Sequence, residues 1–269
     1  MNIVKFPELN LEFKFSKIAF SLFGINIYKY AVCIVLGILV ALILCKISKP
    51  KYGIEYDFVL ENFIIGMLFG IIGARIYFVL FNFNYFSKNV FEIFNIRNGG
   101  LAIYGGLILS GIAIMINCKI KKKDILNFLD YVIPYISIAQ CIGRFGNFFN
   151  IEAYGYETNS ILRMGIVKMG KYTEVHPVFL YEAIGTFIIF VILKNIQKKR
   201  KFKGEIILLY LIFYSGIRAV LENLRIDSLM LFNWRISRDF VCFNIFWFIS
   251  CINMSKFVYQ KISQILIIY

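Results

Sequence analysis

The chain has 269 residues, of which 59% are hydrophobic and 17% are charged, and its formal net charge is +14. The apolar fraction exceeds that of an ordinary soluble domain and is concentrated in long runs, which excludes a soluble globular protein and indicates a membrane protein. The positive charge does not indicate nucleic-acid binding, because much of it lies in short loops between the apolar runs.

The apolar runs are long enough to cross the hydrocarbon core of a bilayer as helices. In chain order they are residues 23–47, 58–82, 100–118, 128–147, 177–195, 204–222 and 239–263. The fourth is the least apolar of these segments. The pattern predicts an all-α, polytopic fold with seven transmembrane helices, in which residues 1–269 form a single integral membrane domain.

The charged loops predict the orientation of these spans. Lysine and arginine concentrate in residues 46–51, 119–123 and 194–203, and cytoplasmic loops carry such an excess of positive charge. An odd number of spans then places the N-terminus outside and the C-terminus in the cytoplasm. The connections left on the outer face, where the functional polar residues gather, are residues 83–99, 148–176 and 223–238.

Two segments of the outer face lie outside the predicted spans. Residues 1–22 mix charged and aromatic side chains, which predicts an amphipathic arm on the outer surface. The alternative for this arm is a helix packed on the outer loops. Residues 148–176 form the longest connection, an outer loop that could hold a soluble protein partner or cover a site as a lid.

A cluster of polar residues follows the fourth apolar run, within residues 141–155 (CIGRFGNFFNIEAYG). On a helix Arg144 shares a face with Asn147, and Asn150 continues that face toward Glu152. One guanidinium and two amides form a donor array suited to phosphate oxygens. The alternatives are that Arg144 reaches to the membrane interface or is paired with Glu152, but charge within a span usually marks a functional site.

A second array lies at the end of the sixth run. Arg218, Glu222 and Arg225 are spaced i, i+4 and i+7, which places them on one stripe of a helix. A glutamate between two arginines can hold their guanidinium groups in a fixed orientation for a shared anion. The alternative is an interfacial ion pair of modest strength.

Tyr104 lies between two glycine pairs, Gly99-Gly100 and Gly105-Gly106, near the start of the third run. The absence of neighbouring side chains exposes the phenol and lets a lipid or another helix approach. By itself this pattern is weak evidence of function, because interfacial tyrosines and packing glycines are common in membrane helices.

The remaining candidate residues have ordinary structural explanations beside the functional ones. Arg75 and Lys29, the latter beside Tyr28, are intramembrane or interfacial cations that could extend to the interface. His176 directly precedes Pro177, which fits a helix start better than catalysis. The six cysteines form no CxxC pair and have no companion histidine cluster, so a metal site is not indicated.

Taken together, these residues resemble the prolipoprotein diacylglyceryl transferases, bacterial membrane enzymes that begin lipoprotein maturation. The blocks that carry the resemblance occur in the family's order over most of the chain. They are Gly143–Asn150 with Glu152 and Gly155, the glycine-flanked Tyr104, His176-Pro177 with Leu180–Glu182, and Arg218, Glu222 and Leu224–Leu229.

The resemblance implies an enzyme of the bacterial plasma (inner) membrane. It would transfer the diacylglyceryl group of phosphatidylglycerol to the lipobox cysteine thiol of a preprolipoprotein, forming a thioether and releasing glycerol phosphate. Its partners would be phosphatidylglycerol, the signal peptide with its lipobox cysteine, and membrane lipids. No metal and no organic cofactor is implied.

The resemblance also implies roles for the candidate residues. Arg144 and Arg218 would stabilise the departing phosphate. Tyr104 stands where many members carry histidine, and it would donate a hydrogen bond to a phosphate or glycerol oxygen, since a phenol with a pKa near 10 is a poor base. The residues expected to bind the substrate or orient these arginines are Asn147, Asn150, Glu152, Glu222, Arg225, Tyr28 and Arg75.

Two other functions remain open from the residues alone. A secondary transporter of an organic anion would also place arginines in a helical bundle, although here the charges cluster at one face and no inverted repeat is evident. Another transferase acting on a phospholipid or polyprenyl phosphate would use the same paired arginines, because they recognise phosphate and not what is attached to it.

Overall fold

The computed structural model of the chain describes residues 2–96, 99–168, 170–226, 230–231 and 234–235. The predicted seventh span and the predicted cytoplasmic C-terminus lie outside the described residues. The chain divides into two compact units. Met1–Ile47 with Ile133–Tyr269 form the large unit, and Ser48–Val132 form the small unit.

Six long helices correspond to the first six predicted spans. They are α1 (Lys29–Ile47), α2 (Tyr56–Phe81), α4 (Ile103–Ile120), α5 (Ile125–Asn150), α6 (Val178–Ile196) and α7 (Glu205–Glu222). Shorter helical turns are α3 (Phe83–Phe86), η1 (Pro7–Leu9), η2 (Val90–Phe94) and η4 (Gln197–Lys199). Among the described residues, α1, α2, α4, α5 and α6 are long and apolar enough to cross a membrane. The helical, membrane-type architecture is thereby confirmed.

The prediction of an all-α fold is wrong outside these helices. The strands are β1 (Asn2–Phe6), β2 (Leu11–Phe15), β3 (Ile18–Leu22), β4 (Ile25–Tyr28), β5 (Met164–Lys168), β6 (Lys171–Val175), β7 (Met230–Leu231) and β8 (Trp234–Arg235). Of the predicted arm, the described residues 2–22 therefore form β1, β2 and β3 and the single turn η1, and no α-helix. The physical reason is a period of two, as in the LEFKF sequence of β2, where apolar and charged residues alternate.

An antiparallel sheet of four strands joins the N-terminal segment to the long connection 148–176. Its order is β2-β1-β5-β6, with Val4 of β1 opposite both Phe13 of β2 and Ile166 of β5. Arg163 ties the same parts together through ion pairs with Glu8 at 2.7 Å and Glu174 at 2.6 Å. The hydrogen bond to Glu8 raises the pKa of this guanidinium.

One face of this sheet is buried against two helices of the large unit. Val4, Phe6, Phe15, Met164, Ile166 and Val175 form a core with Phe179 at the start of α6, and Phe148 and Phe149 from the end of α5 pack against it. Alternate residues of a strand point to the same face, so β1 and β5 each supply two residues of this core, whereas β2 and β6 supply only Phe15 and Val175. The sheet thereby fixes the chain that follows α5.

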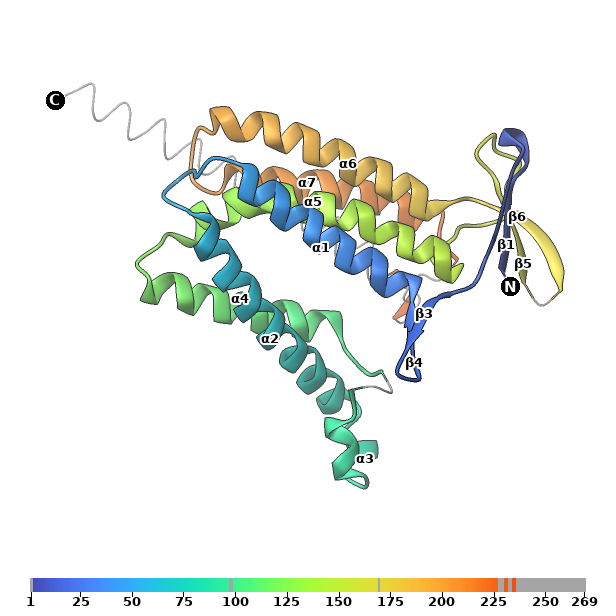
Figure 1. Cartoon of the computed structure of the whole chain (residues 1–269), viewed down its shortest axis with the longest axis horizontal. Helices are drawn as coiled ribbons and strands as arrows, with labels where there is room; N and C mark the ends of the chain where they lie inside the picture. Colours follow the sequence, from blue (N-terminus) through green and yellow to red (C-terminus); the bar gives the residue numbers. More distant parts are fainter. Residues whose placement is uncertain (1, 97–98, 169, 227–229, 232–233, 236–269) are drawn as a thin grey trace. The chain divides into compact units, whose positions relative to one another are not determined.

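The helices of the large unit form a bundle of α1, α5, α6 and α7 (Figure 1). The Ser137 hydroxyl of α5 donates to the Thr186 carbonyl of α6 at 2.8 Å, and the Tyr210 hydroxyl of α7 donates to Gln140 of α5 at 2.7 Å. Gly37 of α1 lies against the backbone of α5, where a side chain would collide with the Ala139 carbonyl. These contacts bring the end of α5, the start of α6 and the end of α7 to the same end of the bundle.

The small unit is built on the close packing of α2 against α4. Gly73 and Gly105 place the two backbones in contact, as the glycine pattern predicts for helices in a membrane. The buried amide of Asn117 donates to the Asn62 side chain at 3.3 Å. A polar pair in an otherwise apolar helix interface fixes the register of the two helices.

Candidate active site

The polar cluster after the fourth run forms where α5 ends and the chain reverses. The Glu152 amide donates to the Asn147 carbonyl at 3.1 Å, and Ile151 and Ala153 have positive φ angles of 51° and 54°. Positive φ is unfavourable for residues with a β-carbon, above all for a β-branched one. The tight turn is thus held by its surroundings, and it returns Glu152 to the face of α5 that carries the asparagines.

Glu152 then holds the side chains of that face. Its Oε1 atom accepts hydrogen bonds from the Asn147 amide at 3.0 Å and from the Asn150 amide at 3.3 Å. The Asn147 oxygen lies 3.5 Å from Nη1 of Arg144. The predicted face of Arg144, Asn147, Asn150 and Glu152 therefore exists, but Glu152 positions the amides and does not pair with Arg144.

A buried glutamate on α6 joins the two predicted arginines. Glu182 is 1% exposed, and its Oε1 lies 2.6 Å from Nη2 of Arg144. Its Oε2 lies 3.5 Å from Nη1 of Arg218. Nη2 of Arg218 is 2.9 Å from the buried carboxylate of Glu222, as the i, i+4 spacing predicts. The two arginines, which come from different helices, therefore meet at one carboxylate.

Tyr214 of α7 completes this network. Its hydroxyl donates to Oε1 of Glu182 at 3.1 Å and accepts from Nη2 of Arg144 at 3.4 Å. Its ring is stacked on Tyr210, with ring centroids 5.7 Å apart. Tyr214 precedes Arg218 by one helical turn, so it continues the stripe that the spacing of Arg218 and Glu222 defines.

The arginines keep capacity for a ligand. Their side chains are 24% exposed for Arg144 and 18% exposed for Arg218. Within the described part of the chain, the Nε donors of both make no hydrogen bond. Two guanidinium groups with fixed orientation and free donors have the chemistry to bind an anion such as a phosphate.

Sequence reasoning missed Glu182 and Tyr214 as members of this site. Both carried a signal, because Glu182 is an acid within an apolar span and Tyr214 lies on the stripe of Arg218. An ionisable residue in a span is expected to have a partner in the bundle. The partners of Glu182 could not be predicted from local spacing, since Arg144 and Arg218 lie on two other helices.

The end of α7 is joined to the turn after α5 by its backbone. Gly155 pairs with Arg225, and the Tyr156 amide donates to the Leu224 carbonyl at 2.9 Å. Gly155 is required because a β-carbon there would collide with that same carbonyl and with His176. His176 also exchanges backbone hydrogen bonds with residues 155 and 156, which fits its predicted structural role.

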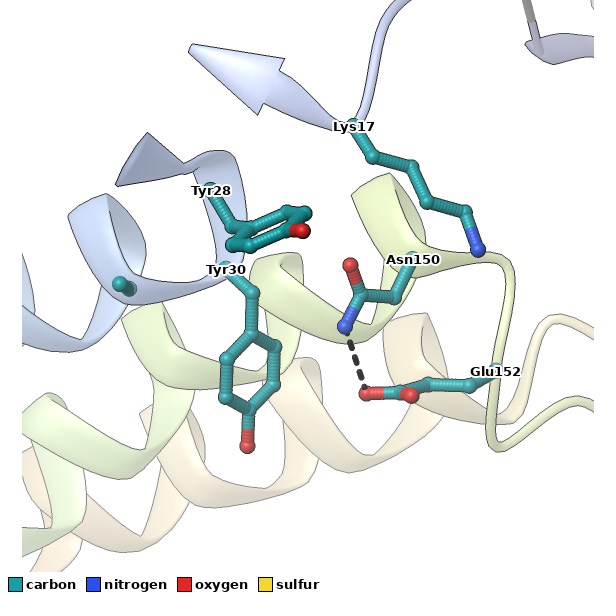
Figure 2. Close-up of a pocket in the computed structure, with 6 residues that line it drawn as sticks. Lys17, Tyr28, Tyr30, Asn150 and Glu152 are labelled. Atoms are coloured by element: carbon teal, nitrogen blue, oxygen red, sulfur yellow. Dashed lines mark hydrogen bonds between the residues drawn. The ribbon is translucent and has the colours of Figure 1, made fainter. Parts of the chain in front are cut away.

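A pocket lies beside this turn in the large unit (Figure 2). Lys17, Tyr28, Tyr30 and Ala31 line it from the N-terminal segment, and Asn150 and Glu152 line it from the end of α5. Tyr28 was predicted to bind the substrate, whereas Lys17 and Tyr30 were not among the predicted site residues. The ring of Tyr30 packs on Gly146, where any side chain would collide with it.

Arg75, in the small unit, has a different role from the predicted one. Its five guanidinium hydrogens are directed at the carbonyls of Glu92, Ile93, Asn95, Gly99 and Gly100, at distances from 2.5 to 3.1 Å. Gly100 has φ of 79° and lies against the guanidinium, so it must be glycine. Arg75 therefore clamps the connection between α2 and α4 and has no donor left for a lipid.

Tyr104, also in the small unit, lies in the first turn of α4 and is 51% exposed. The Gly105 that follows it packs α4 against Gly73 of α2. The glycine pair on this side thus serves helix packing, and the phenol is left exposed as predicted.

The fold is that of a helical membrane protein in which two arginines from different helices contact one buried glutamate at one end of a helix bundle. The family model described as prolipoprotein diacylglyceryl transferase matches residues 17–254. The chain belongs to this family, whose members are transferases of lipoprotein biosynthesis.

Relatives with the name phosphatidylglycerol–prolipoprotein diacylglyceryl transferase are similar over most of their length. The protein of Clostridioides difficile is 44% identical over 80% of this chain and 85% of its own. Those of Finegoldia magna and Clostridium novyi are 42% and 41% identical, each over 82% of this chain and 88% of its own.

Proposed function

We propose that this protein transfers the diacylglyceryl group of phosphatidylglycerol to the lipobox cysteine of a preprolipoprotein, the first step of lipoprotein maturation. The cysteine sulfur forms a thioether with the glycerol carbon, the bond from that carbon to the phosphate oxygen breaks, and glycerol phosphate leaves. Family membership and the names of the relatives support this reaction. The structural observation that carries it is the convergence of Arg144 and Arg218 on Glu182.

The two arginines would act on the leaving group. A thiolate is the nucleophile, so the thiol releases its proton, which is a product beside the thioether and glycerol phosphate, and the phosphate gains a negative charge as its bond to carbon breaks. Arg144 and Arg218 would stabilise that charge through donors that are already in place. Glu182 holds both guanidinium groups before the substrate arrives, so little reorganisation accompanies the reaction.

The residues around the arginines would position the phospholipid. Asn147, Asn150 and Glu152 form a connected set beside Arg144 that can orient a polar head group. Glu222 holds the Nη2 nitrogen of the Arg218 guanidinium, whose Nη1 lies nearer to Glu182. For Arg225, the backbone pairing with Gly155 supports a role in holding the end of α7 beside the turn. Tyr28 would contact the lipid from the pocket.

Tyr104→Phe tests the proposed hydrogen bond from the phenol to a phosphate or glycerol oxygen. Removal of this one hydrogen bond should lower the lipidation rate by about fivefold, since such a bond is worth roughly 1 kcal/mol. Tyr85→Phe is the matched control, because that exposed phenol bonds to Glu92 in the same unit. An unchanged rate in Tyr104→Phe would remove the hydroxyl from the mechanism.

The proposed orientation places the arginine site on the outer face of the bacterial plasma (inner) membrane, in a protein with seven spans. In the large unit, the basic residues 194–203 lie where α6 passes into α7, at the end of these helices away from Arg218. Single cysteines introduced at Lys199 and Thr158, in a variant whose own cysteines are replaced by serine, should react with a membrane-impermeant maleimide only at Thr158 in intact cells. Labelling of Lys199→Cys and not of Thr158→Cys would show that the protein has the opposite orientation in the membrane.

The direct test of function is a lipidation assay. Purified protein, phosphatidylglycerol and a lipobox peptide should yield a peptide whose intact mass has increased by one diacylglyceryl group. A folded protein that gives no adduct on the peptide with the lipid present would contradict the proposal. A transporter of an organic anion would instead move solute into vesicles without covalent change to the peptide.

A further inference from the structure

We propose that Lys17 is a specificity-determining residue, which favours a phospholipid with an uncharged polyol head group over one with an ammonium head group. It would do so by opposing Glu152 across the pocket of Figure 2. The inference rests on the proposed function, because it assigns the head-group end of the phospholipid to this pocket.

Lys17 occupies a fixed place between β2 and β3. Its carbonyl accepts the Lys29 amide at 2.9 Å, which ties it to the start of α1. The Ile18 amide donates to the Ser16 hydroxyl at 3.1 Å. The side chain extends from this point toward the end of α5, where Asn150 and Glu152 form the other wall (Figure 2).

The ammonium of Lys17 is uncommitted, unlike its neighbours. Within the described residues it makes no ion pair or hydrogen bond. Lys14 pairs with Glu12 at 3.1 Å, and the ammonium of Lys29 lies over the rings of Phe15 and Phe149. Lys17 is thus the cation of this segment that the pocket can use.

Glu152 supplies the opposite charge and a spare acceptor. Both amides that bind it, those of Asn147 and Asn150, reach Oε1. In the described part of the chain, Oε2 accepts no hydrogen bond. A carboxylate alone on this wall would attract an ammonium head group, because opposite charges in a partly desolvated pocket attract strongly.

Lys17 and Glu152 together remove the preference for an ammonium head group that Glu152 alone would give. An ammonium group near Glu152 would also lie near Lys17, and the repulsion would offset the attraction. A glycerol head group has hydroxyls that both donate and accept, so it can donate to Glu152 and accept from Lys17 and the Asn150 amide. The pocket therefore matches the head group of phosphatidylglycerol and rejects that of phosphatidylethanolamine.

Competition between the two lipids tests this assignment. We would measure initial rates of peptide lipidation in micelles with fixed phosphatidylglycerol and increasing phosphatidylethanolamine, for the wild type and for Lys17→Met. The phosphatidylethanolamine concentration that halves the rate should be about five- to tenfold lower for the variant than for the wild type. This is the effect expected from one charge contact in a site of intermediate dielectric constant. Lys17→Arg should keep the wild-type selectivity.

Lys14→Met is the matched control, because it removes the same charge from the same segment outside the pocket. A shift of equal size in Lys14→Met would assign the effect to general surface charge and overturn the inference. An unchanged inhibition in Lys17→Met would overturn it as well. Thermal unfolding in detergent checks that each variant is folded, and Lys17→Gln provides a second neutral variant.

A binding measurement separates this inference from the proposed function. Native mass spectrometry of the protein with equal amounts of the two lipids gives the ratio of bound phosphatidylglycerol to bound phosphatidylethanolamine. This ratio should fall in Lys17→Met by the same factor. A wild type that lipidates no peptide would contradict the function alone, whereas an unchanged ratio would contradict the role of Lys17.

Discussion

Arg144→Lys should lower the rate of peptide lipidation by about 100-fold, the usual effect of removing one preorganised donor at a developing charge. Lysine keeps the positive charge, but its ammonium cannot contact Glu182, Asn147 and a phosphate oxygen in one plane. Arg218→Lys should have a similar effect, because Arg218 bridges Glu182 and Glu222 with two separate nitrogens. The loss should appear mainly in kcat, since the charge on the phosphate grows toward the transition state.

Arg163→Lys is the control for these two variants. Arg163 also contacts two carboxylates, those of Glu8 and Glu174, but in the sheet and away from the Glu182 network. Its substitution should leave the lipidation rate near that of the wild type. Steady-state kinetics with the lipobox peptide, after a check of thermal unfolding, give the comparison. If Arg144→Lys keeps near-normal kcat while folded, the guanidinium group has no part in stabilising the leaving group.

Apolar runs alone were sufficient to place the helices. The predicted segment 58–82 is α2, and the predicted segment 204–222 is α7, each with ends within two residues. Hydrophobicity over a bilayer-length window is a strong signal, because a span in lipid must form all its backbone hydrogen bonds internally and is therefore a helix. The first span begins six residues later than predicted, at Lys29, because residues 25–28 pair in a hairpin with β3.

The sheet could not be predicted in the same way. Strands of about five residues carry little signal, and β1 finds its partner β5 at Val4 and Ile166, far apart in the chain. The period of two is clear in the five residues of β2, but most of residues 1–22 fit an amphipathic segment of either period. The pairing of β1 with both β2 and β5 selects the strands.

The site was predictable where it depends on local spacing. Arg144 with Asn147, and Arg218 with Glu222, follow from helical periodicity, and both sets lie on one face as expected. What spacing cannot show is which group from another helix lies between them. Arg75 illustrates the same limit, because its carbonyl partners come from a connection whose conformation the sequence does not specify.

Glu182→Gln should be the most damaging neutral substitution in the bundle. The buried carboxylate is the shared counter-ion of two arginines, and its loss leaves two like charges close together with fewer partners. Breaking a buried ion pair from one side typically costs about 3 kcal/mol or more in stability. Lipidation should also be abolished, because neither guanidinium would keep the orientation that the phosphate requires.

A double substitution separates the role of the pair from that of the single residue. In Arg144→Gln with Glu182→Gln, the uncompensated charge of Arg144 is absent, so the loss of stability should be smaller than the sum of the single losses by about 1 to 3 kcal/mol. Unfolding in mixed micelles by increasing dodecyl sulfate measures these differences. Glu61→Gln, which removes an exposed carboxylate paired with Lys121 at 3.3 Å, should change stability by less than about 1 kcal/mol. Additive losses in the double variant would show that Glu182 does not serve as the counter-ion of Arg144, and the preorganisation of the arginine site would need another source.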